Sequence, residues 1–165
     1  MTVEHTFAAG LVLVQAIVLQ PDFPTNPHGG GEPEQQVSRV WRTVPGMEYE
    51  ITLEDDGLVE VTGHVGFQFE DKRCDPDDKF MTGIALAING RQVRAPLGTY
   101  ATQNAQRWQH YRDMPFSWLV PLERGEYVIE LMAVAVPKGK AIVSGCQAWF
   151  KQSQYNGMAI KVYAP

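Results

Sequence analysis

The stretch MPFSWLVPLERGEYVIELMAVAVPKGKAIVSGCQAWF, residues 114–150, decides the fold class because it reads as consecutive strands with their turns marked. Large side chains occupy alternate positions from 114 to 122 and again from 127 to 131, which is the period of a strand with one buried face. Arg124-Gly125 and Pro137-Lys138-Gly139 supply turns after these two runs. The pattern predicts antiparallel strands joined by short turns, and therefore an all-β sandwich or barrel.

The same pattern continues over most of the chain. Asp56-Gly57 and Asn89-Gly90 are residue pairs preferred in two-residue hairpin turns, and Pro45-Gly46 is expected to close another strand. No long segment has a helical period. The total is about eight to ten strands. Outside the opening stretch they are expected at residues 11–19, 37–44, 47–53, 59–69, 80–88, 92–95 and 158–162, and within it a third strand is expected to start at 141–143.

The chain has the size and composition of one globular domain. Its 165 residues suit a single core, with an N-terminal strand and Pro/Gly-rich loop at residues 1–36 and a sandwich at residues 37–165. The net charge of -5, with no run of Lys or Arg, argues against nucleic acid as a partner.

The early apolar run at residues 8–19 predicts neither a membrane span nor an export signal. It is about a dozen residues long, against the roughly 20 that a spanning helix needs. Glu4 precedes it, no Lys or Arg does, and no small-residue cleavage pattern follows. We therefore expect a chain made in the cytoplasm, without membrane insertion.

The two cysteines lie in unlike settings. Cys74 is in a polar loop and Cys146 in an apolar segment. Two cysteines are too few for a disulfide framework, so we expect both to be free thiols.

No constellation of catalytic residues is found. Nucleophile elbows, phosphate-binding loops and dinucleotide fingerprints are absent, so the sequence predicts no enzyme and no cofactor. No His-x-His pair of the kind that a cupin metal site uses is present, and scattered histidines are more typical of a surface than of metal ligands. On the polar face of its strand, His64 is expected to be solvated. The four histidines are His5, His28, His64 and His110.

One acidic loop has the ligand chemistry of a cation site. Asp75, Asp77 and Asp78 could together offer several oxygens to Ca²⁺. The loop lacks the spacing of an EF-hand, and Lys72 and Arg73 offset its charge. A solvated turn is favoured, and the sequence leaves calcium binding open.

Residues 96–113 are the best candidate for a binding surface. The segment is eighteen residues long, has no regular period, and is expected to form a loop between two strands. It combines aromatic faces, amides and arginines with little aliphatic content, as an interface does. The alternative, that Trp108 and Tyr111 only fold the loop onto the sandwich, stays open. The candidate partner- or glycan-binding residues are Tyr100, Gln103, Asn104, Arg107, Trp108, His110, Tyr111 and Arg112.

Four segments resemble the jelly-roll domains of the tumour necrosis factor and complement globular-head superfamily, and the related heads of bacteriophage fibres and spikes. They are the strand start at 56–61, the hairpin at 88–90, the turn step at 120–128 and the closing strand at 157–163. The resemblance covers residues 37–165. It implies a ten-stranded jelly roll, usually a trimer, that binds receptors or glycans and catalyses nothing. The strand at 11–19 and the Pro/Gly-rich loop after it depart from the family pattern.

Three predicted strands are apolar on both faces, at residues 11–19, 80–88 and 132–136. A sandwich strand with one wet face alternates, so these strands are more apolar than one core requires. We expect the strand at 11–19 to be covered on both faces. The surplus apolar surface is best used between subunits, and together with the resemblance it predicts a homotrimer.

These features predict an all-β jelly-roll β-sandwich with a non-enzymatic role. The expected function is that of a virion structural or surface protein, such as a bacteriophage head decoration, spike or fibre component. It would act at the virion surface by oligomerisation and by binding capsid, receptor or glycan. The first alternative is a lectin-like carbohydrate-binding module outside a virion, in an extracellular location, and the second is a cupin-type metal enzyme.

Overall fold

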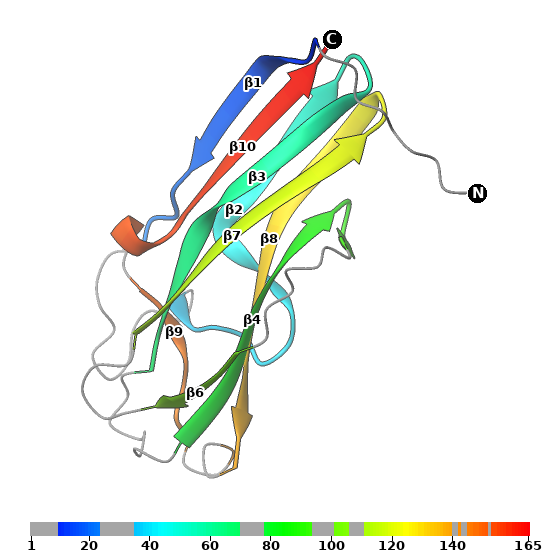
Figure 1. The fold of residues 1–165 in the computed structure, drawn as a ribbon. Coiled ribbons are helices and arrows are strands. Elements are labelled where there is room, and N and C mark those ends of the chain that lie inside the picture. The colour runs from blue at the N-terminus through cyan, green and yellow to red at the C-terminus, as the bar shows by residue number, and fades with distance from the viewer. Residues whose placement is uncertain are drawn as a thin grey trace.

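The computed structural model describes residues 10–23, 35–69, 78–93, 101–105, 111–139, 142, 145–151 and 153–165. Over these residues the chain forms two antiparallel β-sheets of five strands each, which we name sheet A and sheet B (Figure 1). The strands are β1 (Val12–Leu19), β2 (Arg42–Leu53), β3 (Gly57–Gln68), β4 (Asp78–Ile88), β5 (Arg91–Gln92), β6 (Ala101–Ala105), β7 (Tyr111–Leu122), β8 (Gly125–Lys138), β9 (Trp149–Phe150) and β10 (Gly157–Ala164), and a short 3₁₀ helix, η2 (Ser153–Tyr155), precedes β10.

The strand order is that of a jelly roll. Sheet A has the order β1-β10-β3-β7, with β9 beside the end of β3, and sheet B has the order β2-β8-β4, with β5 and β6 also paired to β4. Consecutive long strands therefore alternate between the sheets, as the two Greek keys of a jelly roll require. In Figure 1 the four long strands of sheet A lie side by side, with β2 and β8 behind them. The predicted all-β jelly-roll β-sandwich of about eight to ten strands is confirmed.

The core fills the space between the two sheets with the alternating large residues of both. Val59, Val61, Val65 and Phe67 of β3 are fully buried, and so is Leu131 of β8. Burying a side chain of this size contributes about 1.5–3 kcal/mol, so the alternation that the sequence shows is also the main source of stability. The alternating large residues of β4, β7 and β10 are buried or partly buried as well.

The hairpin between β4 and β5 confirms the Asn-Gly prediction. Asn89 and Gly90 have φ angles of 50° and 74°, and positive φ at both central residues is the requirement of a type I′ turn. The Asn89 side-chain oxygen also accepts a hydrogen bond of 2.8 Å from the backbone N–H of Val128 on β8. The return strand, β5, is only two residues long, shorter than the predicted 92–95, of which 94 and 95 lie outside the described residues.

The predicted strand end at Pro45-Gly46 is wrong, because β2 runs through both residues. The register of β2 against β8 shifts between Thr43 and Glu48, which marks a bulge. Since β2 is an edge strand, the N–H that proline lacks is not needed by a second neighbour. Gly46 has a φ of 78°, a conformation that glycine adopts without strain.

The first part of the predicted strand at 37–44 is also not a strand. Residues 37–41 instead form backbone hydrogen bonds to two separate segments. The Val37 N–H donates to the carbonyl of Ala148, and the Ala135 N–H donates to the carbonyl of Ser38, both at 2.9 Å. This segment therefore lies alongside β8, just before the start of β2.

The strand predicted to start at 141–143 is not formed at Ile142, the one residue of the three that the structure describes. The Ile142 N–H donates to the carbonyl of Gly139 at 3.2 Å, which continues the turn after β8. Trp149 and Phe150 alone form β9, which pairs with Gln68 and Phe67 of β3. Apolar composition without alternation was a weak strand signal at this point.

The prediction of a free thiol at Cys146 is wrong. Cys146 is disulfide-bonded and fully buried. Spacing along the chain carries no information on which cysteines meet in space, so the sequence could not show it. Cys74 lies outside the described residues.

Candidate functional site

The predicted binding segment at 96–113 is more regular than expected. Gln103 and Asn104 lie in β6, opposite Phe80 and Lys79 of β4. The expectation of an eighteen-residue loop without strands is therefore wrong. Propensity missed β6 because its sequence, ATQNA, has little β-branched or aromatic content, and its pairing with β4 determines its conformation.

The other six candidate residues divide between β7 and the part of the chain that the structure does not describe. Tyr111 and Arg112 open β7, opposite Gln68 and Phe67 of β3. The remaining four candidates lie outside the described residues, and they are Tyr100, Arg107, Trp108 and His110. The choice between a binding loop and a loop packed onto the sandwich stays open.

The strands that carry the described candidates reach the same end of the sandwich. β6 ends beside the start of β4, where Ala105 pairs with Asp78, and β7 starts beside the end of β3, where Tyr111 pairs with Gln68. β9 also lies at this end (Figure 1). We call it the loop end. It receives candidates from both sheets, β6 from sheet B and β7 from sheet A.

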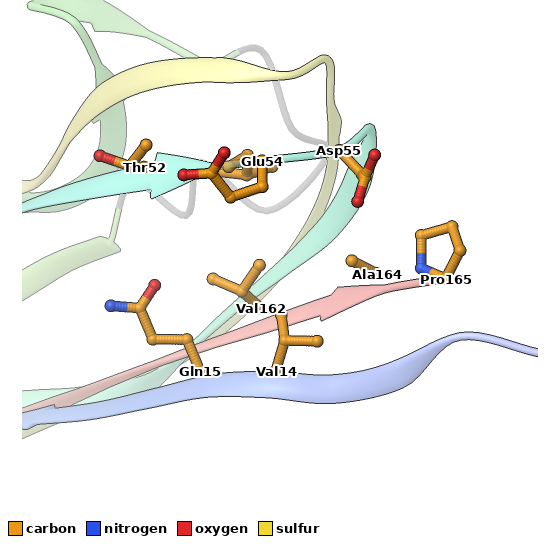
Figure 2. Close-up of a pocket in the computed structure, with 9 residues that line it drawn as sticks. Val14, Gln15, Thr52, Glu54, Asp55, Val162, Ala164 and Pro165 are labelled. Carbon is orange, nitrogen blue, oxygen red and sulfur yellow. The ribbon is translucent and has the colours of Figure 1, made fainter.

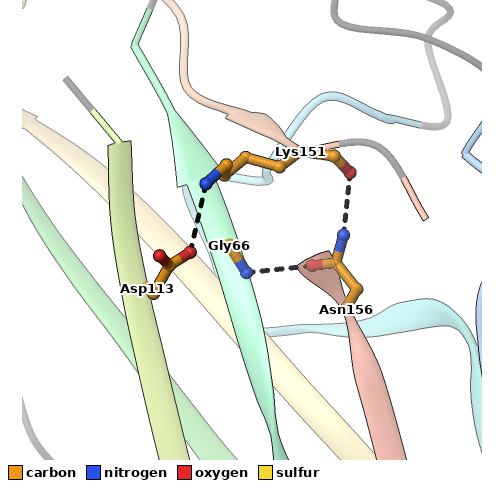
Figure 3. Close-up of polar contacts among 4 residues, drawn as sticks. All are labelled: Gly66, Asp113, Lys151 and Asn156. Carbon is orange, nitrogen blue, oxygen red and sulfur yellow. Dashed lines mark hydrogen bonds and ion pairs between the residues drawn. The ribbon is translucent and has the colours of Figure 1, made fainter. Parts of the chain in front are cut away.

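A buried lysine fixes the point where β7 starts at the loop end. The side chain of Lys151 is only 6% exposed, and its Nζ lies 3.3 Å from Oδ1 of Asp113, which is 59% exposed (Figure 3). Nζ also lies 3.8 Å from the ring centroid of Tyr155, a cation–π contact. The lysine stem covers Gly66, where a Cβ would lie 2.6 Å from Cδ of Lys151.

Asn156 completes this cluster through backbone groups. Its side-chain nitrogen donates to the carbonyl of Lys151 at 2.8 Å, and its oxygen accepts from the N–H of Gly66 at 3.0 Å (Figure 3). The Lys151 N–H donates to the carbonyl of Gly66 at 2.8 Å. The cluster ties the connection between β9 and β10 to β3 and β7. The polar sequence of residues 151–157 does not reveal this cluster.

A pocket of about 330 Å³ lies at the opposite end of the sandwich. Figure 2 shows Val14 of β1 and Val162 of β10 on one side and Thr52, Glu54 and Asp55 on the other. Both carboxylates are exposed. The nine lining residues include no histidine, cysteine or lysine, so the pocket does not bring together the acid, base and nucleophile that a catalytic site combines.

Metal-binding geometry is not found among the described residues. Within them no group of three or more His, Cys, Asp or Glu is placed to hold a metal ion. His64 is described and is exposed on β3. Of the possible calcium ligands, Asp75 and Asp77 lie outside the described residues, and only the backbone of Asp78 is described, at the start of β4. In the same part of the chain no helix is long and apolar enough to cross a membrane.

The outer face of sheet A is the most apolar surface that the described strands present. Three rows of outward residues cross β1, β10, β3 and β7. Leu13, Val18 and Leu119 in these rows are 52%, 78% and 61% exposed. The rows are Leu13-Tyr163-Leu58-Pro121, Ala16-Lys161-Glu60-Leu119 and Val18-Ala159-Thr62-Ser117.

The charges on this face neutralise each other. Among the twelve residues of the three rows, only Lys161 and Glu60 are charged, and Lys161 Nζ lies 3.6 Å from Oε2 of Glu60. The hydroxyl of Tyr163 donates to the same carboxylate oxygen at 3.1 Å. The face therefore has no net charge, although the whole chain carries -5.

The outer face of sheet B differs in both respects. Glu48 lies directly opposite Glu130 across β2 and β8, and Glu50 and Glu126 point to the same side. Glu130 is half-buried, and its carboxylate accepts hydrogen bonds from Thr43 Oγ1 at 2.9 Å and from the Gly90 N–H at 3.2 Å. The other three carboxylates of this acidic part of the face are exposed to water.

The apolar part of the same face is covered by the chain itself. A Cβ at Gly83 would lie 2.9 Å from Cη2 of Trp41 and 3.3 Å from Cγ1 of Val134, so the Trp41 indole lies against β4 beside β8. This contact accounts for part of the apolar outer side of 80–88 and 132–136. The corresponding expectation for 11–19 is wrong within the described chain, because the edge strand β1 has exposed apolar side chains.

Comparisons with known proteins show no family for this chain. No family model matches the chain, and no curated protein matches it. One solved structure that it resembles is that of infectious bursal disease virus, Gt strain, with 16% sequence identity, a TM-score of 0.44, and coverage of 93% of this chain and 31% of that chain. Another is dimeric latent PorU from Porphyromonas gingivalis, with 8% identity, a TM-score of 0.44, and coverage of 96% and 13%. The chain spans less than a third of either. Membership of the tumour necrosis factor and complement superfamily stays a prediction.

Proposed function

We propose that this chain is a non-enzymatic structural protein of a virion that works by self-association and by binding other virion proteins, a receptor or a glycan. A head decoration, spike or fibre component of a bacteriophage is the form that the sequence predicts. The single observation that carries the proposal is the unequal treatment of the two outer faces. Sheet A exposes an apolar face without net charge, whereas sheet B is acidic or covered by Trp41.

An exposed apolar face does not stabilise an isolated chain in water. Contiguous exposed apolar surface on a protein marks a place where another molecule binds. The edge strand β1 adds unpaired backbone groups to the same surface, which favour pairing with a further strand. Both features suit a subunit whose sheet A side is covered after assembly. The state predicted from the sequence is a homotrimer, and only a mass measurement tests it.

Two further features support a virion. The jelly roll is the fold of many viral capsid and lectin domains, although fold alone does not determine function. Disulfides such as that of Cys146 persist in oxidising surroundings, among them the surfaces of virions and cells. The non-enzymatic part of the proposal rests on the sequence, which has no nucleophile or cofactor motif.

Density-gradient fractionation of particles from a culture that produces the protein tests this proposal. The chain should sediment with virus particles, at a fixed stoichiometry to the major capsid protein by quantitative mass spectrometry. Detection of the chain only in the fractions of free protein would contradict it.

A lectin-like module outside a virion is the second candidate, favoured by the loop end. β6 and β7 bring Gln103, Asn104, Tyr111 and Arg112 to this end from both sheets, and amides with aromatic rings are the groups that bind sugars. A glycan array distinguishes the two. Specific glycan binding by a chain that never sediments with particles would favour the lectin.

A further inference from the structure

Each sheet has two outer edges, and the four edges are not equally protected against pairing with another strand. Edge strands are normally blunted by proline, charge, bulges or short length, because unpaired backbone groups attract other strands. On the far edge of sheet A, β7 contains Pro115 and Pro121. On one edge of sheet B, β2 contains the bulge at Pro45-Gly46 and the charges of Glu48 and Glu50.

The remaining edge of sheet B is protected by its short strands. It is made of β5, with two residues, and β6, with five. Both pair with β4, at its two ends. Neither offers a second chain a long regular edge.

β1 is the exception. It has eight residues, VLVQAIVL, without proline and without charge. Among the described residues it pairs only with β10, and its single irregularity is a register shift between Leu13 and Gln15. From Gln15 to Leu19 the ladder with β10 is regular, so the opposite side of these five residues presents regular, unprotected backbone groups.

The charge around β1 allows a second copy to approach. Two chains of net charge -5 repel each other over most of their surface. Beside β1, however, the outward charges are Lys161 and Glu60, which form an ion pair. Val18, 78% exposed, and Ala16 point outward from β1 itself and are apolar. Two β1 strands therefore meet without placing like charges opposite each other.

The symmetry follows from the edges. Because the other three edges of the chain are blunted, the β1 edge of one copy finds its match only in the β1 edge of another. A patch that contacts its own copy generates a two-fold axis, and two identical strands related by a two-fold axis perpendicular to the sheet run antiparallel, as all pairs in this fold do.

We propose that two copies of this chain pair antiparallel along Gln15–Leu19 of β1, so that sheet A of one copy continues into sheet A of the other. This inference rests on the proposed self-association and names its surface and partner. The exposed side chains of Leu13 and Val18 become partly buried at the junction. The outer faces of the two sheets A join into one surface without net charge.

Sedimentation velocity of the full chain over a range of micromolar concentrations, with two matched variants, tests the pairing. Val18→Lys places a charge on the proposed junction, and Val40→Lys makes the same change at a side chain that is 60% exposed beside Trp41 on the sheet B side. Thermal unfolding of each variant at low concentration checks that both fold. The wild type and Val40→Lys should sediment as two chains or an even multiple, and Val18→Lys as one chain.

The outcomes separate this inference from the proposed function. A wild-type mass that Val18→Lys does not reduce, or a mass of three chains, would overturn the β1 pairing and leave self-association standing. A wild-type mass of one chain at every concentration would overturn both. Loss of association in Val40→Lys but not in Val18→Lys would move the interface to sheet B.

Discussion

The outer faces of sheets A and B are built from the same alternating strands and yet are used differently. On sheet B, one part carries exposed carboxylates such as Glu48 and Glu50, and Trp41 covers the apolar part from within the chain. On sheet A no described segment covers the corresponding residues, and Val18 remains 78% exposed. The comparison teaches that apolar residues on the outer side of a strand do not by themselves indicate a subunit interface. The informative ones are those that the chain leaves uncovered.

This distinction changes the basis for self-association. The sequence treated three strands, 11–19, 80–88 and 132–136, as equal evidence for contacts between subunits. The side chain of Trp41 accounts for part of the second and third, because it lies against β4 at Gly83, beside Val134 of β8. Of these three strands, β1 is the one that keeps an exposed apolar side for a partner to cover.

The largest expected effect is that of removing the cover of sheet B. Trp41→Ala should lower the free energy of unfolding by about 2–3 kcal/mol, somewhat below the cost of truncating a fully buried tryptophan, because Trp41 is partly exposed. Leu119→Ala, on the uncovered face of sheet A, should change it by no more than about 0.5 kcal/mol. Urea unfolding at low protein concentration measures both. Equal losses would contradict the contrast between the two faces.

An intermediate effect is expected at the loop end, where Asp113 forms an ion pair with a buried lysine. Asp113→Ala removes this carboxylate from the ammonium of Lys151, which keeps the Tyr155 ring beside it, and should cost about 1–2 kcal/mol. The full cost of about 3–5 kcal/mol for a broken buried pair is not expected, since Asp113 is 59% exposed.

The matched variant at this site removes the charge itself. Lys151→Met keeps the apolar stem over Gly66 and removes the need for a counter-ion, so it should cost less than Asp113→Ala. The same urea experiment compares them. A larger loss for Lys151→Met would mean that the ammonium is stabilising in its own right, and that the cluster does more than fasten the start of β7.

The smallest effect is expected on the acidic part of sheet B. Glu48→Lys converts the like-charge pair with Glu130 into an attractive one and should stabilise the chain by about 0.5 kcal/mol at low salt. Glu126→Lys makes the same change in net charge opposite Thr52 and should gain less. The difference between the two variants should fade in 1 M salt, because exposed charges are then screened. An equal gain in both would mean that net charge alone matters.

The sequence predicts the fold well because period-two alternation and turn residues act locally. β3 and β7 have large side chains at every second position, and the turn at Asn89-Gly90 depends only on the φ angles of these two residues. The failures lie where a distant segment decides the structure. β6 forms because it pairs with β4, and the bulge in β2 follows from the pairing of β2 with β8. The buried Lys151 forms its ion pair with Asp113, which is 38 residues away in the chain.

The candidate site was predicted less completely than the fold. Composition selected the segment at 96–113, but composition does not show that Gln103 and Asn104 join sheet B while Tyr111 and Arg112 join sheet A. The exposed edge of β1 was visible in the sequence only as an uninterrupted apolar run, which is equally the pattern of a strand buried on both faces. Exposure depends on which strand lies at the edge, and that is a property of the topology.

Hydroxyl-radical footprinting of the chain, dilute and self-associated, tests most directly whether the chain associates through the β1 side of sheet A and leaves sheet B in water. Leu13 and Val18 are exposed on β1, and Tyr49 is 37% exposed on β2, the edge strand of sheet B. On association the oxidation of Leu13 and Val18 should fall, because both side chains become partly buried at the junction, and that of Tyr49 should not change. Protection of Tyr49 with undiminished oxidation of Leu13 and Val18 would contradict the account.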